Sequence, residues 1–212
     1  MTAASTIVLL HGLARSQHDM RLLAHRLRKL LPQSHVHCFD YPSRKLTLEA
    51  ATCSLREYTK TLAGDGAVSF VGHSLGGIVA RNLDLIGGCE RPLHRLVTLG
   101  SPHNGAAIAR FLSRYRGPQA VFGPILSELG SLNLPEQPRE LEIGCLIGGT
   151  NTRFGFLPLF GADNDGTVLA HEAALPGATA HKVLPILHAL FPFSTRAATL
   201  TATFLSHGNF QK

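Results

Sequence analysis

The sequence predicts an α/β fold with a mostly parallel sheet of about six strands and helices on both faces. Short aliphatic runs alternate along the chain with stretches of helical spacing, which is typical of this class. The run at residues 7–10 is unbroken and aliphatic, as expected of a strand buried on both faces. The 212 residues, 44% hydrophobic and 16% charged, suffice for one domain but not for two enzyme domains. We therefore expect a single domain over residues 1–212.

The elements follow in a regular order. Apolar runs place strands at residues 7–10, 36–39, 67–71, 96–99, 143–147 and 182–184. Helical periodicity places helices at residues 20–31, 47–62, 75–86 and 194–205. Pro32 ends the first of these helices, and Ser194 is the expected cap of the last. Two long segments, 103–140 and 148–164, interrupt the alternation, and loops of this length are usually functional or locally folded.

Composition limits the location and the partners. No apolar run reaches the roughly 18 to 20 residues of a membrane span. Residues 1–5 carry no basic residue before a short apolar run, so we expect no secretory signal and a cytoplasmic location, with export by other routes left open. The four cysteines form no CxxC pair or zinc-finger spacing, and we expect them to be reduced and mostly buried.

The net charge of +6 comes from basic residues that are scattered, apart from residues 26–29. Nucleic-acid binding therefore has weak support. Peripheral contact with an anionic membrane surface and attraction of acidic substrates fit this charge equally well.

The strongest motif is a G-x-S-x-G pattern. It reads Gly72-His73-Ser74-Leu75-Gly76 and stands between a predicted strand and a predicted helix. A nucleophile elbow requires this context, because the turn is crowded and the two glycines let neighbouring backbone approach. Ser74 is therefore the candidate nucleophile. The alternative is a Gly-rich turn with a capping serine.

An oxyanion hole is expected near the end of the first strand. A serine nucleophile needs two backbone N–H donors aimed at the developing oxyanion. Leu75 follows the nucleophile and supplies one, and Leu13, in the segment His11-Gly12-Leu13, is expected to supply the other. Gly12 lets this loop turn tightly past a substrate. We interpret His11 as a residue that braces the loop.

These motifs resemble those of bacterial α/β-hydrolase lipases and esterases. Residues 8–12 are similar to the oxyanion strand and loop of that family, residues 72–77 to its elbow, and residues 164–168 to its acid loop. The resemblance spans about residues 6–207 and implies the α/β-hydrolase fold. The family's usual first hairpin is missing, which implies a minimal six-stranded version.

The resemblance also implies an acid after the fifth strand, because the family's chain order is Ser, then acid, then His. The late carboxylates are Glu142, Asp163, Asp165 and Glu172. Asp165 precedes Gly166 and matches the family's D-G-x-V pattern. Asp163 is the rival.

The base is expected after the last strand. The late histidines are His171, His181, His188 and His207. His188 follows the sixth strand and precedes the final helix, which is where a base must lie to reach Ser74. We expect His181 and His207 far from the active edge and His171 on a surface helix. The alternative for His188 is a structural loop histidine.

Several residues are expected to support the site without reacting. They are His11, Gly12, Gly72, His73, Gly76 and His103. His103 follows the fourth strand, where the corresponding loop of the resembling lipases packs beside the elbow. Residues 41–44, after the second strand, are interpreted as an ordinary turn, and the alternative is a rim of the pocket.

Residues 103–140 lie where α/β-hydrolases commonly insert a cap. Their apolar side chains include Phe111, Leu112, Val121, Phe122, Ile125, Leu126, Leu129 and Leu132. We expect a small helical cap that shapes an acyl pocket. A second wall is expected from Phe154, Phe156, Leu157, Leu159 and Phe160. The alternative is that these residues complete the core around the sheet.

The sequence thus predicts a serine hydrolase that cleaves carboxylic esters through an acyl-enzyme. The expected substrate is a medium-chain or lipid-like acyl ester. Thioesterase and acyltransferase activity stay open because one triad serves all three reactions, and a non-catalytic binding protein of this fold is a further alternative. No metal or organic cofactor is expected, because no phosphate loop or ligand cluster occurs.

Overall fold

The computed structural model describes residues 6–64, 66–135 and 141–211. One six-stranded sheet runs in the order β2-β1-β3-β4-β5-β6, and every neighbouring pair is parallel. The strands are β1 Thr6–Leu10, β2 His35–Phe39, β3 Val68–His73, β4 Leu93–Leu99, β5 Glu142–Gly148 and β6 Ala180–Leu184. The predicted α/β fold with a six-stranded parallel sheet is confirmed.

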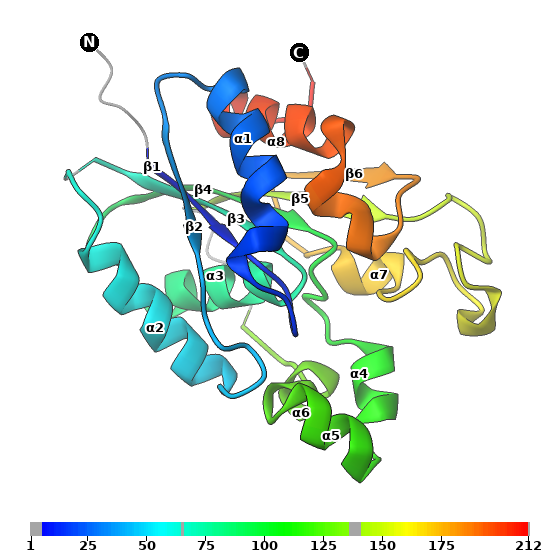
Figure 1. Ribbon diagram of the computed structural model, residues 1–212. Coiled ribbons are helices and arrows are strands. Elements are labelled where there is room, and N and C mark those ends of the chain that lie inside the picture. Colours follow the sequence, from blue (N-terminus) through cyan, green and yellow to red (C-terminus); the bar gives the residue numbers. More distant parts are fainter. Residues whose placement is uncertain (1–5, 65, 136–140, 212) are drawn as a thin grey trace.

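Helices cover both faces of the sheet (Figure 1). Helices α1 (Arg21–Leu30) and α8 (Thr195–His207) lie on one face, and α2 (Leu48–Lys60) and α3 (Leu75–Leu85) lie on the other. Shorter helices are η1 Gln17–Met20, α4 Ala107–Leu112, α5 Arg116–Phe122, α6 Ile125–Gly130, η2 Pro158–Phe160, α7 Ala170–Ala173 and η3 His188–Phe193. The Ser194 side chain accepts a hydrogen bond from the Ala197 N–H and caps α8, as predicted.

Both faces of strand β1 are buried, which explains why residues 7–10 are aliphatic throughout. Ile7 and Leu9 pack in the core between the sheet and helices α1 and α8. Val8 and Leu10 pack in the core on the α2 and α3 side. Burial of such a side chain stabilises the fold by about 1.5–3 kcal/mol, so a polar residue at any of these positions would be costly.

Strands β4 and β5 begin earlier than predicted. β4 begins at Leu93 and β5 at Glu142. Arg95 and Glu142 are register partners, and their side chains form an ion pair of 2.6 Å. Charged residues therefore extend these strands at the amino end of the sheet, where an apolar pattern does not reveal them.

The segment predicted to form a cap contains α4, α5 and α6, called the cap below, which group together beyond α3 and α7 in Figure 1. Two carboxylates fasten it to the body. Glu128 accepts a hydrogen bond from the Leu48 N–H at the start of α2, and Glu172 accepts one from the Ala107 N–H at the start of α4. Ile125, Leu126 and Leu129 are buried in the core that α2 and α3 also form. Pro138 and its neighbours at residues 136–140 lie outside the described residues.

The expectation of mostly buried cysteines was wrong. Cys145 is buried, but Cys53 is exposed and Cys38 and Cys89 are half-buried. Cys53 lies on α2 between buried Ala51 and Leu55, on the solvent side of the helix. All four thiols are free in the described part of the chain.

Two further features concern the described residues only. No helix among them is both long enough and apolar enough to cross a membrane. They also contain no group of three or more His, Cys, Asp or Glu side chains that would hold a metal ion.

Candidate active site

The elbow at Ser74 is a strained turn between β3 and α3. Ser74 has φ +54° and ψ −121°, a conformation that costs about 1–3 kcal/mol and persists only where the surroundings enforce it. A Cβ at Gly72 would lie 2.2 Å from the Gly77 nitrogen, and one at Gly76 would lie 2.6 Å from the Leu10 oxygen. Both glycines of the motif are therefore required by close backbone packing.

Asp165 and His188 are joined by two hydrogen bonds. The His188 Nδ1 lies 2.7 Å from the Asp165 Oδ2, and the His188 N–H donates to the Asp165 carbonyl at 2.9 Å. The Asp165 Oδ1 accepts from the Thr167 and Val168 N–H groups at 3.0 and 2.7 Å. A carboxylate accepts only, so the His188 Nδ1 carries the proton and Nε2 keeps a free lone pair.

The rival carboxylates have other partners. The Asp163 side chain accepts from the Thr150 and Asn151 N–H groups at 2.8 and 2.9 Å and fixes the loop after β5. Glu142 pairs with Arg95, and Glu172 anchors α4. Within the described ranges, Asp165 is the one carboxylate that bonds to His188.

The other late histidines lie elsewhere, as predicted. His171 is exposed on α7, and His207 is the last residue of α8. His181 lies near the start of β6, and its Nε2 bonds to the Leu175 carbonyl at 2.9 Å.

Backbone hydrogen bonds join successive loops at the carboxyl edge of the sheet. The Ser74, Gly100 and Gly149 N–H groups donate to Leu99, Leu146 and Leu184 carbonyls, each at 2.9 Å. Gly100 has φ +62°, and a Cβ there would lie 3.1 Å from both the Asp165 Oδ2 and the His188 Nδ1. Gly100 was not among the predicted site residues, although a glycine directly after a strand at the carboxyl edge is a usable signal.

The loop after β1 lies against the elbow. A Cβ at Gly12 would lie 3.1 Å from the Ser74 Cβ, so only glycine leaves this space open. The Leu13 N–H has no acceptor among the residues described. The Leu75 N–H begins α3 and therefore has no acceptor within its helix. These are the two donors that the sequence assigns to the oxyanion hole.

A cavity of about 300 Å³ opens beside Ser74 and His188. Gly12 and Leu13 line it on the sheet side. Its remaining wall is mainly apolar and includes Ile108, Leu112, Phe122, Leu126, Leu129 and Val168. The cap therefore supplies much of the apolar wall next to the nucleophile.

Comparison with protein families adds a match over more than half of the chain. The model of the palmitoyl protein thioesterase family matches residues 6–129. The chain belongs to the palmitoyl protein thioesterase family. The matched span runs from β1 into α6 and contains Ser74, whereas Asp165 and His188 lie beyond it.

Solved structures share the fold of this family member. Mature lipase BlEst2 of Bacillus licheniformis superposes with a TM-score of 0.75 at 19% identity, covering 98% of this chain and 93% of that one. Its propeptide form gives a TM-score of 0.72 at 21% identity over 89% of this chain, which spans 47% of that longer chain. The NocB thioesterase domain from the nocardicin cluster gives 0.58 at 19% identity, covering 97% and 93%.

No curated protein sequence matches this chain. The matched family is one of hydrolases, and the fold agrees with that class.

His11 braces the loop after β1 in this thioesterase-family protein. The Tyr41 N–H donates to the His11 Nε2 at 3.3 Å, so His11 Nδ1 carries the proton and donates to the Gly12 carbonyl at 2.9 Å. The two rings stack with centroids 4.4 Å apart, and the Tyr41 hydroxyl donates to the His11 carbonyl. Burial lowers the pKa of His11, which favours this neutral form. The turn at residues 41–44 is therefore part of the support, which its turn-like sequence did not reveal.

His73 and His103 have different environments. The His73 Nε2 lies 3.0 Å from the His188 carbonyl and donates to it, so His73 holds the backbone of His188. Burial lowers the pKa of His73 well below its usual value. His103 bonds to Thr98 Oγ1 at 3.2 Å, and burial lowers its pKa to about 3. Ser101, rather than His103, bonds to the elbow, at the Gly72 carbonyl.

The expectation that residues 154–160 form a second wall of the cavity was wrong for the described side chains of this segment. None of those at Phe154, Phe156, Leu157 and Phe160 lines the cavity beside Ser74. The Asn164 side-chain amide donates to the carbonyls of Phe154, Leu157 and Ala162 and folds this loop on itself. Phe154, Phe156 and Leu157 are exposed, and the side chain of Leu159 lies outside the described part.

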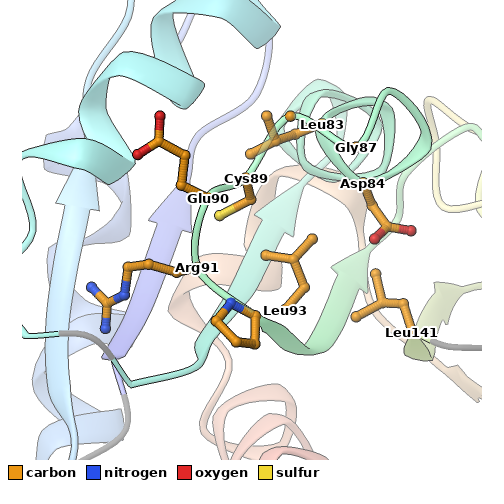
Figure 2. Close-up of a pocket in the computed structure, with 10 residues that line it drawn as sticks. Leu83, Asp84, Gly87, Cys89, Glu90, Arg91, Leu93 and Leu141 are labelled. Carbon is orange, nitrogen blue, oxygen red and sulfur yellow. The ribbon is translucent and has the colours of Figure 1, made fainter.

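A second hollow of about 420 Å³ lies at the other end of the sheet (Figure 2). Leu83, Leu93 and Leu141 line it near the amino ends of β4 and β5, and Figure 2 shows Arg91 extending away from Leu141. The Arg91 guanidinium bonds to the Gly66 carbonyl and the Thr6 hydroxyl. This hollow is separated from the elbow by the length of the strands and contains no residue assigned to the chemistry.

Proposed function

We propose that this protein is a serine hydrolase that cleaves acyl esters or thioesters through an acyl-enzyme on Ser74. The supporting observation is that Ser74 and His188 line one apolar cavity, with Asp165 bonded to the ring of His188. An apolar cavity with a few convergent polar groups is the usual form of a small-molecule site.

The proposed reaction uses the free lone pair of His188. His188 Nε2 takes the proton of the Ser74 hydroxyl as the oxygen attacks the substrate carbonyl. The Leu13 and Leu75 N–H groups stabilise the oxyanion, and Asp165 stabilises the imidazolium that forms. His188 then protonates the departing alcohol or thiol. A water molecule, deprotonated by His188, releases the acid and restores Ser74.

Ser74 Oγ has no hydrogen bond to His188 among the described contacts. In free enzymes this contact is often long and tightens when substrate binds. Both residues line the same cavity, so we expect the bond to form in the substrate complex.

The cavity and the family support a proposal for the substrate class. A volume of about 300 Å³ is at the lower end of the range of about 300–1,000 Å³ for ligand pockets, which favours a medium-chain acyl group. The family is described as palmitoyl protein thioesterases, and this favours a thioester as the second candidate. A cap-lined apolar wall fits either bond, because both carry the same acyl chain.

Matched p-nitrophenyl esters and N-acetylcysteamine thioesters, from acetyl to decanoyl, test this proposal. Each methylene that enters the cavity contributes up to about 0.8 kcal/mol, nearly fourfold in kcat/KM. We expect kcat/KM to rise with chain length until the cavity is full. A flat or falling series would overturn the acyl-pocket assignment, and the ratio of the two series identifies the preferred bond.

Variants test the proposed roles of Ser74 and His188. Ser74→Ala and His188→Ala should each remove nearly all activity, and the double variant should lose little more, since triad members act as a unit. Near-normal activity in His188→Ala would show that the base is another group.

A further inference from the structure

A second cleft adjoins the cavity that contains Ser74. It has a volume of about 500 Å³ and is lined by residues 14–16, after β1, and 40–45, after β2. β1 and β2 are neighbours in the sheet, so both loops lie at the carboxyl edge, where ligands of open α/β sheets bind. Arg15 lines this cleft and also the cavity of Ser74. The two spaces therefore meet at Arg15.

The cleft is basic, unlike the apolar cavity. Arg15, Arg44 and Lys45 line it, against the single carboxylate of Asp40. The Arg44 and Lys45 side chains are exposed and have no ion pair or hydrogen bond within the described residues. Arg15 pairs with Asp19 at 3.2 Å through one guanidinium nitrogen, which leaves its other donors free.

Asp40 forms no ion pair with these cations within the described residues. Its Oδ1 accepts from the Gln17 N–H at 2.9 Å and lies 3.2 Å from the His11 Nε2. The three cations outnumber the one carboxylate that lines the cleft, so the lining has a net positive charge.

The walls of the cleft are fixed before any ligand arrives. The Ala14 N–H donates to Ser43 Oγ at 3.0 Å, and the Lys45 N–H donates to the Pro42 carbonyl at 2.8 Å. The Arg44 carbonyl packs against the cap, because a Cβ at Gly123 would lie 1.7 Å from it. The two free cations thus stand on a loop held between the oxyanion loop and the cap.

We propose that this cleft binds the leaving group, and that the preferred leaving group is an alcohol or thiol bearing a phosphate. The inference rests on the proposed function: an acyl chain in the apolar cavity with its carbonyl at Ser74 directs the departing group toward the polar side, past Arg15. Arginine and lysine bind phosphate through charge-assisted hydrogen bonds, and a fixed basic cleft also raises the local concentration of anions.

The test compares charged and neutral leaving groups on one acyl chain. The thiol arm pairs octanoyl coenzyme A with octanoyl N-acetylcysteamine, and the lipid arm pairs octanoyl lysophosphatidate with mono-octanoylglycerol. We expect kcat/KM to favour a phosphate-bearing substrate in at least one arm, and that arm identifies the source of the phosphate. The preference should shrink as salt is raised, because exposed charges are screened.

The double variant Arg44→Ala/Lys45→Ala should lower kcat/KM for the favoured charged substrate by roughly tenfold and leave its neutral partner within about twofold. Lys29→Ala/Arg56→Ala removes the same charge from exposed positions on α1 and α2 and should change neither. Equal loss in both double variants, or no preference for phosphate in either arm, would overturn the proposal.

A binding measurement separates this inference from the proposed chemistry. Calorimetry with coenzyme A and with glycerol 3-phosphate needs no turnover. We expect binding of at least one of them that weakens roughly tenfold in Arg44→Ala/Lys45→Ala. If neither ligand binds but the neutral substrates are cleaved, the proposed role of the cleft is wrong and the proposed hydrolase chemistry stands. If a ligand binds but no substrate is cleaved, phosphate binding in the cleft is supported and the proposed hydrolase activity is wrong.

Discussion

The carboxyl edge of the sheet and the cap are fixed to different degrees. At the edge, the Asp165 side chain accepts three hydrogen bonds, and glycines leave room for contacts that no side chain would allow. In the cap, Phe111 and Val121 are exposed, and two carboxylates connect the helices to the body. On the proposed function, the edge therefore holds reacting groups in one geometry, and we expect substitutions on the cap to change the acyl pocket without disturbing the chemistry. The predictions below compare the two regions.

The largest expected contrast is between two aspartates of one loop. Asp165→Asn should lower kcat by about 10³- to 10⁴-fold, because an amide at this position no longer stabilises the imidazolium or fixes the tautomer of His188. Asp163→Asn is the matched control, since its partners are the backbone N–H groups of Thr150 and Asn151. Steady-state kinetics on one ester will measure both. Equal losses, or a larger loss in Asp163→Asn, would move the acid to Asp163.

Gly100→Ala should lower kcat on the order of tenfold. Its Cβ would lie 3.1 Å from the Asp165 Oδ2 and from the His188 Nδ1, so the pair must shift. Gly105→Ala controls for backbone strain, because Gly105 also has a positive φ but no atom closer than 3.5 Å to the added Cβ. If both variants lose activity to the same extent, strain rather than contact with the pair explains the effect.

In the cap, Leu112→Ala should shift the optimal acyl chain to a longer length and change kcat/KM by about fourfold per methylene. Leu112 is half-buried and lines the cavity. Phe111 is its neighbour on α4, is 55% exposed and does not line the cavity, so Phe111→Ala should leave the chain-length profile unchanged. An unshifted optimum in Leu112→Ala would show that the acyl chain binds elsewhere.

The smallest effect on turnover is expected for substitution of His103. Its protonation makes the stability of the folded protein depend on pH. Burial lowers the pKa of His103 to about 3, so below about pH 6.5 the unfolded chain binds a proton that the folded chain does not. The free energy of unfolding should fall as pH falls, by about 1.4 kcal/mol per pH unit from this residue. Urea unfolding from pH 7 to 4 should show a flatter dependence in His103→Gln and an unchanged one in His25→Gln, at an exposed site. If the free energy of unfolding of His103→Gln depended on pH as steeply as that of the unsubstituted protein, this account would be contradicted.

The sequence predicted the sheet because periodicity and glycines report directly on backbone geometry. The aliphatic run of β1 and the elbow at Ser74 are local features, and a short segment contains all the information they need. The position of His188 follows from chain order once the fold is assumed. Its bond to Asp165 remained an expectation until the two loops were placed together.

Contacts between distant segments were harder to predict. Tyr41 and His11 are hydrogen-bonded although they lie 30 positions apart in the sequence. The Glu172 side chain accepts from the Ala107 N–H, at the start of α4, across 65 positions. The wall expected at residues 154–160 failed because hydrophobicity predicts burial but not direction. One buried amide, Asn164, determines how that loop folds.

Covalent labelling with a fluorophosphonate tests the central claim most directly. Intact mass spectrometry of the full chain should show one adduct per molecule, located at Ser74 by peptide mapping and absent from Ser74→Ala. Labelling should slow strongly in Asp165→Asn and stay near the unsubstituted rate in Asp163→Asn, because of these two aspartates it is Asp165 that bonds to the His188 ring. An adduct that persists in Ser74→Ala, or an unsubstituted protein that is folded yet unlabelled, would contradict the assignment of Ser74 as the nucleophile.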